Sequence, residues 1–157
     1  MQDIFTVYHA EQQLSWARSI NDNSNRIVQE WSSRFVALGN TFQFQQIQIN
    51  AQEYWVAQGI RIFTNFRLTT ERGVALSIDI AVQNWSVRAG TSIINETMTE
   101  AERMVAMTNS VVYQSNPQWQ NATRARKETI VNGTGFVNGR DWNIYNEFGI
   151  RDRVIIQ

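Results

Sequence analysis

Residues 68–87, LTTERGVALSIDIAVQNWSV, place one carboxylate, Asp79, in the middle of a largely apolar run. Thr69 or Thr70 can cap a helix start, and Glu71 suits the positive end of the helix dipole. Apolar residues then recur at helical spacing: Val74, Ala75, Ile78, Ala81 and Val82. Asp79 lies at the edge of that stripe, where an unpaired charge costs roughly several kcal/mol. The run therefore predicts a core helix whose aspartate is paired with an arginine or a lysine.

The composition excludes several other chemistries. The 157 residues suit one domain over 1–157, and 14 basic and 14 acidic side chains leave no net charge, so no nucleic-acid partner is expected. Without cysteine, and with His9 as the only histidine, we expect no metal site, no cofactor and no thiol chemistry. From its apolar pattern we expect no signal peptide in this chain, no membrane span and a soluble protein.

Apolar residues recur at helical spacing over most of the chain, so the elements that position Asp79 are predicted to be helices. The apolar spacing predicts helices over residues 4–20, 27–38, 41–66, 68–87 and 101–112, and another that starts at Asn116 and Pro117. The segment 41–66 is one helix or two, with Gly59 as a break or a close-packing point. Thr97 or Thr99 caps the helix over 101–112. The segment TIVNGTGFV, residues 129–137, has β-branched residues on both sides of a turn sequence and predicts a short hairpin. The aromatic tail after it is expected to fold back over the helices. The fold class is mainly α with a short C-terminal β-hairpin.

The order of these segments resembles a known family. QIQINAQEYWVAQGIRIFTNFRLTT, GVALSIDIAVQNW, ATRARKETI and TIVNGTGFVNGRDWNIYNEFGI follow one another as in the larger lobe of chitosanase-like glycoside hydrolases of the lysozyme superfamily. The resemblance covers roughly residues 43–150 and implies a lysozyme-like helical lobe. It also implies that Asp79 pairs with Arg126 and that this pair supports a catalytic glutamate from behind. The competing interpretation is a buried ion pair that only fixes helix packing.

The chain departs from that family at its N-terminal end. The resemblance implies a catalytic glutamate at the end of an N-terminal helix, and Glu11 is the candidate there, with Asp3 the only other acid nearby. The glycine-rich sheet that would carry a second carboxylate is not identifiable in the sequence. Since an inverting enzyme needs an acid and a base roughly 6.5–9.5 Å apart, one lobe cannot supply both. The chain is therefore either the C-terminal part of a larger hydrolase or a relative without the chemistry.

Three residues at the exit of the Asp79 helix are candidates for binding substrate. Gln83, Asn84 and Trp85 face a sugar-binding cleft in one interpretation, whereas Gln83 and Asn84 form a polar helix cap in the other. Trp119 and Trp142 also fall near loops, where indole rings can stack on sugar faces.

Two functions remain open from the sequence. The first is a domain directed at peptidoglycan or chitosan, a glycoside hydrolase if active, with a polysaccharide as partner and a possible second polypeptide covering the missing lobe. The second is a non-catalytic structural or interaction module, for example of a phage tail or injection apparatus. Either function is compatible with an extracellular or virion-associated protein.

Overall fold

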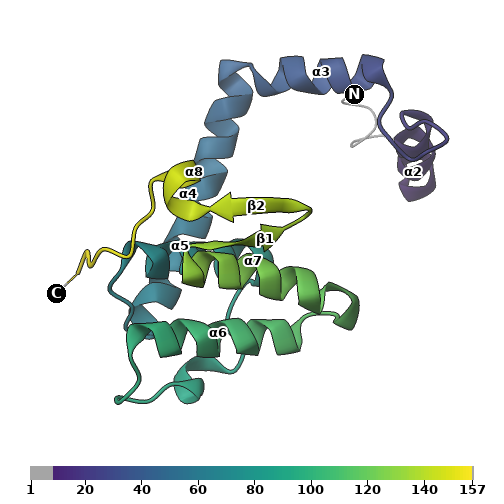
Figure 1. The fold of residues 1–157 in the computed structure, drawn as a ribbon. Coiled ribbons are helices and arrows are strands. Elements are labelled where there is room, and N and C mark those ends of the chain that lie inside the picture. The colour runs from purple at the N-terminus through teal and green to yellow at the C-terminus, as the bar shows by residue number, and fades with distance from the viewer. Residues whose placement is uncertain (1–8, 157) are drawn as a thin grey trace. The chain divides into compact units, whose positions relative to one another are not determined.

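The computed structural model describes residues 9–156, which divide into two compact units at Asn50 and Ala51. Each unit is described by itself below, and the single domain over 1–157 stays a prediction. The described chain is mainly helical with one short two-stranded sheet, which confirms the predicted fold class (Figure 1). No described helix has the length and apolar content that a membrane span requires.

The unit that ends at Asn50 consists of α2 (Ala10–Ser19), α3 (Gln29–Gly39) and the first part of α4 (Phe42–Asn65). Between α2 and α3, Asp22 accepts hydrogen bonds from the backbone N–H groups of Ser24 (2.8 Å) and Arg26 (2.9 Å), which close the turn between the two helices. Trp16 packs edge-on against Trp31, with ring centroids 5.4 Å apart. Residues 4–8 of the first predicted helix lie outside the described residues.

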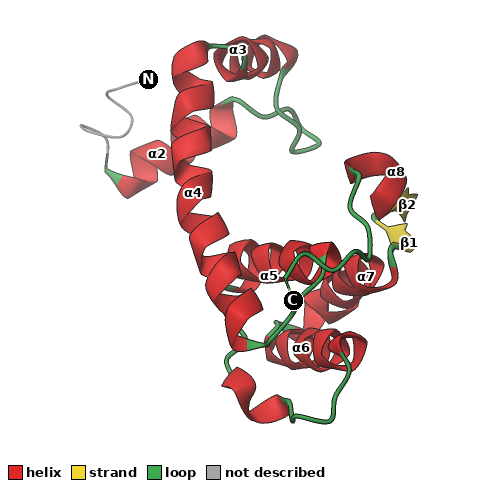
Figure 2. Ribbon diagram, turned by 90° about the vertical axis from the view of Figure 1, so that its left-hand side faces the viewer, coloured by secondary structure: helices red, strands yellow, loops and turns green. Residues whose placement is uncertain are grey.

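The unit that begins at Ala51 holds the second half of α4 together with α5 (Glu71–Asn84), α6 (Glu100–Gln114) and α7 (Gln120–Asn132). Short 3-10 turns, Gly90–Ile93 and Pro117–Trp119, precede α6 and α7. Figure 2 shows α5, α6 and α7 packed beside one another. Their facing sides bury one apolar core, which includes Phe63, Phe66, Leu76, Ile80, Met107 and Val111.

Gly59 brings α4 against α5. A side-chain carbon at Gly59 would lie 2.5 Å from Cγ1 and 2.7 Å from Cα of Ile78, so only glycine permits this approach. The helix α4 continues through this position without a break. Of the two interpretations of Gly59, the close-packing one is therefore confirmed.

The N-terminal ends of α5 and α6 are joined through one carboxylate. Thr70 caps α5, and its Oγ1 accepts a hydrogen bond from Gly73 N–H (3.1 Å). Glu100, in the first turn of α6, accepts hydrogen bonds from the backbone N–H and hydroxyl of both Thr69 and Thr70, at 2.5–3.0 Å. Because these donors are otherwise unpaired groups at a helix start, Glu100 fixes where α5 begins.

The hairpin lies four to five residues later than predicted. Its strands are β1 (Thr134–Val137) and β2 (Arg140–Asn143), with Asn138 and Gly139 in the turn at φ 53° and 79°. The prediction that TIV forms the first strand is wrong: residues 129–131 belong to α7, where Val131 enters the core and Thr129 donates to the carbonyl of Ala125 at 2.7 Å. The sequence Asn-Gly at 132–133 ends that helix, since Gly133 adopts φ 80°.

After the hairpin, α8 (Ile144–Phe148) leads into the C-terminal tail. The tail returns to the start of α5, where Ile155 N–H donates to the carbonyl of Thr69 (2.7 Å) and Glu71 N–H donates to the carbonyl of Arg153 (3.0 Å). The aromatic segment predicted to fold back, residues 138–150, forms the hairpin turn, β2 and α8, and the return to α5 is made by the residues after it.

We predict that Glu100→Gln destabilises this unit through lost hydrogen bonds to a charged acceptor. Burial by itself raises the pKa of Glu100, but the hydrogen bonds from Thr69 and Thr70 outweigh it and lower the pKa below its ordinary 4.5. A carboxyl whose pKa is lower in the folded state stabilises the fold above its unfolded pKa, and this stabilisation disappears as the pH falls through the folded pKa. Because Glu100 is partly exposed, we expect a loss of about 1–2 kcal/mol in the free energy of unfolding at neutral pH.

Urea unfolding across the acid range measures this effect. The wild type should lose stability below about pH 4.5 more steeply than Glu100→Gln. Glu96→Gln is the matched control, because the side chain of Glu96 is 87% exposed and forms an ion pair with the exposed Arg67 at 3.5 Å. Identical pH profiles for Glu100→Gln and the wild type would contradict the prediction.

Candidate functional site

Asp79 is buried, with 9% of its surface exposed, and two cations from α7 share its carboxylate. Arg126 donates to Oδ1 through Nε (2.7 Å) and Nη2 (2.5 Å). Lys127, which is fully buried, donates to Oδ2 through Nζ. The predicted contact between Asp79 and Arg126 is thus present, while its supporting role in catalysis stays a prediction. Sequence reasoning missed Lys127, although it stands in the same ARK triplet.

The cluster of Asp79, Arg126 and Lys127 carries one more positive than negative charge. Burial lowers the pKa of Lys127 below the ordinary 10.5, the charge of Asp79 partly opposes this, and the neighbouring charge of Arg126 lowers the pKa further. Removing one member of such a cluster leaves a charge without its partner inside the protein.

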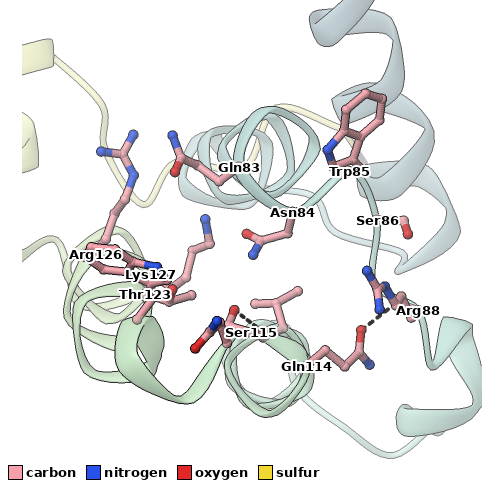
Figure 3. Close-up of a pocket in the computed structure, with 13 residues that line it drawn as sticks. Gln83, Asn84, Trp85, Ser86, Arg88, Gln114, Ser115, Thr123, Arg126 and Lys127 are labelled. Atoms are coloured by element: carbon pink, nitrogen blue, oxygen red, sulfur yellow. Dashed lines mark hydrogen bonds between the residues drawn. The ribbon is translucent and has the colours of Figure 1, made fainter. Parts of the chain in front are cut away.

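A cavity of about 370 Å³ opens beside Lys127, between the C-terminal ends of α5 and α6 and the start of α7 (Figure 3). Its volume is within the range of pockets that hold small molecules. Amides, hydroxyls, cations and indoles dominate its lining: Gln83, Asn84, Trp85, Ser86, Arg88, Val111, Gln114, Ser115, Asn116, Trp119, Thr123, Arg126 and Lys127.

The three binding candidates at the end of α5 all line this cavity. Gln83 and Asn84 are the last residues of the helix, and Trp85 follows. The side chain of Asn84 lies between Lys127 on one side and Arg88 on the other (Figure 3). Its Oδ1 is buried and has no hydrogen-bond partner among the described residues. Such an acceptor is costly to leave buried and unsatisfied.

Trp85 has a strained backbone and an exposed ring. Its φ is 68°, in the left-handed region that a bulky residue rarely adopts, at a cost of about 1–3 kcal/mol. Its side chain is 70% exposed and packs edge-on against Trp55, with ring centroids 5.2 Å apart. Burial does not explain this conformation, whereas an exposed indole at the rim of a cavity is a usual means of binding.

The other two tryptophans considered from the sequence, Trp119 and Trp142, lie in different places. Trp119 lines the same cavity and is 59% exposed. Trp142 lies on β2, where its ring stacks on Phe148 (5.9 Å) and lies under the guanidinium of Arg140 (4.2 Å). Trp142 is therefore part of the packing around the hairpin.

The cavity has no acid or base of the kind that hydrolysis requires: none of the described residues that line it is a carboxylate or a histidine. Glu147, outside the cavity, pairs with Arg140 at 2.5 Å. Glu11 lies exposed in the first turn of α2, in the other unit, and its catalytic role stays a prediction. Within residues 9–156 no three metal-binding side chains gather into one group.

Comparison of the chain with protein-family models, with curated proteins and with solved structures found no match. The resemblance to lysozyme-superfamily hydrolases accordingly stays an expectation from the sequence.

We predict that Asp79→Ala lowers the free energy of unfolding by about 3–5 kcal/mol, because it leaves Lys127 buried without its partner. Arg126→Ala, which removes a side chain that is 49% exposed, should cost only about 1 kcal/mol or less. Urea unfolding of the three proteins measures both changes. A loss below about 1 kcal/mol for Asp79→Ala would show that the carboxylate is not a buried partner.

Proposed function

We propose that the cavity at the end of α5 binds a polysaccharide of amino sugars, of the peptidoglycan or chitosan kind, as the binding wall of a lysozyme-like lobe. The exposed and strained Trp85 carries this proposal, since its backbone holds the indole at the rim of the cavity. Trp119, also exposed, offers a second ring there. Indole faces bind the apolar faces of sugar rings, which polar side chains alone do not.

The polar lining supports the same proposal. Sugar hydroxyl and acetamido groups donate and accept hydrogen bonds at short intervals along a chain. Asn84 has an unsatisfied buried acceptor for such a donor, and Gln83 and Ser86 extend the polar surface beside it. A mixture of indoles, amides and hydroxyls fits a neutral or weakly charged polyol better than an apolar ligand.

Hydrolysis of a glycan requires catalytic groups that the lining of this cavity does not provide. Its chemistry depends on two carboxylates at a fixed separation, and none of the described residues lining the cavity is one. In our proposal this unit binds the glycan, and an acid pair, where hydrolysis occurs, comes from outside the cavity. Glu11 is the first residue of this chain to test for that role.

A test of binding uses Trp85→Gly on insoluble peptidoglycan and chitosan. Glycine adopts φ 68° without strain, so we expect the free energy of unfolding to change by less than about 1 kcal/mol. The fraction bound in pull-down should nevertheless fall about tenfold, because the stacking ring is lost. Tyr113→Ala is the control, since Tyr113 is 85% exposed and does not line the cavity.

Equal binding by Trp85→Gly and the wild type would remove the basis of the proposal. Release of reducing ends is measured in the same samples. If the wild type releases them, Glu11→Gln is the variant that tests whether this chain supplies the acid.

The second candidate function, a structural module of an assembly, is favoured by one surface. Phe42, Ile47 and Ile49 on the first part of α4 are 49–69% exposed, and residues 35–52 include no charged side chain. A second copy of the chain can cover such a surface without charge repulsion. Sedimentation equilibrium at micromolar concentration should then show a dimer or larger species that Ile47→Lys converts to monomer, whereas Gln45→Lys on the same helix should not. A monomeric wild type would exclude this candidate.

A further inference from the structure

Building on the proposed binding of glycans, we infer that the cavity selects amino-sugar polymers that carry carboxylates and rejects cationic ones such as chitosan. The inference depends on the sign of the charges around the cavity. Arg88, Arg126 and Lys127 line it, and no described acidic residue does. Asp79 compensates one of these three charges from within the protein, so about two positive charges remain uncompensated at this surface.

The two ends of the cavity are both cationic. Arg126 and Lys127 lie on one side, Arg88 lies on the opposite side, and Asn84 stands between them (Figure 3). None of the ion pairs within residues 9–156 involves the guanidinium of Arg88. The backbone N–H of Arg88 donates to Gln114 Oε1 at 3.3 Å. Arg88 is thus available to bind a ligand directly. Arg126 and Lys127 both contact Asp79, and they act on a ligand mainly through the one positive charge that Asp79 leaves uncompensated.

This arrangement of charges favours one of the two polymers, peptidoglycan and chitosan, that the sequence analysis did not distinguish. A protonated glucosamine chain would bring an ammonium group towards a buried lysine whose charge is already disfavoured by burial and by Arg126. A polymer with a carboxylate on alternate sugars instead places its negative groups near the cationic ends and a neutral acetamido sugar near Asn84. Peptidoglycan strands without stem peptides, through their free lactyl ether carboxylates, and hyaluronan, through its uronic acids, both have this chemistry.

Four tetrasaccharides test the inference with the full chain, at about pH 6, by titration calorimetry: N-acetylglucosamine (neutral), glucosamine (cationic), the peptidoglycan repeat (acidic) and the hyaluronan repeat (acidic). In low salt we expect the peptidoglycan repeat to bind about tenfold more tightly than the neutral one, and the cationic one to bind about tenfold more weakly. About 0.5 M salt should narrow both differences to roughly twofold or threefold, since the charges are then screened. Comparing the affinities of the two acidic repeats shows whether the cavity prefers a lactyl ether carboxylate or the carboxylate of a uronic acid.

Arg88→Gln should weaken the acidic repeats about fivefold and leave the neutral one within about twofold. Arg61→Gln is the control, because Arg61 is an exposed arginine of α4 that does not line the cavity. An unchanged affinity of Arg88→Gln for the acidic repeats would overturn the assignment of Arg88.

The failure of this inference is distinguishable from the failure of the proposed function. If the neutral tetrasaccharide binds and neither acidic repeat binds more tightly, the charge selectivity is wrong and glycan binding stands. If the cationic tetrasaccharide binds most tightly, the selectivity is reversed. If none of the four binds, both the inference and the proposed function are overturned.

Discussion

One carboxylate shared by two cations is the constraint on which the second unit depends. Asp79 cannot be buried on α5 unless Arg126 and Lys127 reach it, and these residues are 47 and 48 positions away, respectively, on α7. A buried pair of this kind stabilises a fold little in comparison with apolar packing, but an arrangement that separates its members is strongly disfavoured. The cluster therefore specifies how α5 and α7 face each other.

The same constraint determines where the cavity forms. With α5 held to α7 by Asp79 and its start held by Glu100, the helix ends at a fixed position, Asn84. The chain then turns at Trp85 in a left-handed conformation, which puts the indole on the surface and leaves the Asn84 amide inside. Packing elsewhere holds this strained turn, so the side chains that line the cavity are fixed in place by the fold.

The helices were predictable because the apolar stripes of α3, α5 and α6 repeat at a period that depends on the sequence alone. The strand predicted at residues 129–131 failed for the opposite reason: β-branched residues favour strands locally, but burial of Val131 in the core keeps α7 helical. Lys127 was missed because a lysine next to an arginine is usually exposed, and its burial depends on an aspartate far away in the sequence. Local patterns predicted the elements, whereas the site depends on pairings between them.

The positive charge of Arg88, Arg126 and Lys127 around the cavity, called the cationic wall here, also limits which catalytic role a carboxylate beside it can take. Positive charge nearby favours the ionised form of an acid and lowers its pKa. A general acid in glycoside hydrolysis needs the reverse, a raised pKa that keeps its proton at working pH. A carboxylate brought close to Arg126 or Arg88 from elsewhere would therefore be held as an anion, suited to act as base or nucleophile. The proton donor would have to stand away from this wall, where no cation stabilises its charged form.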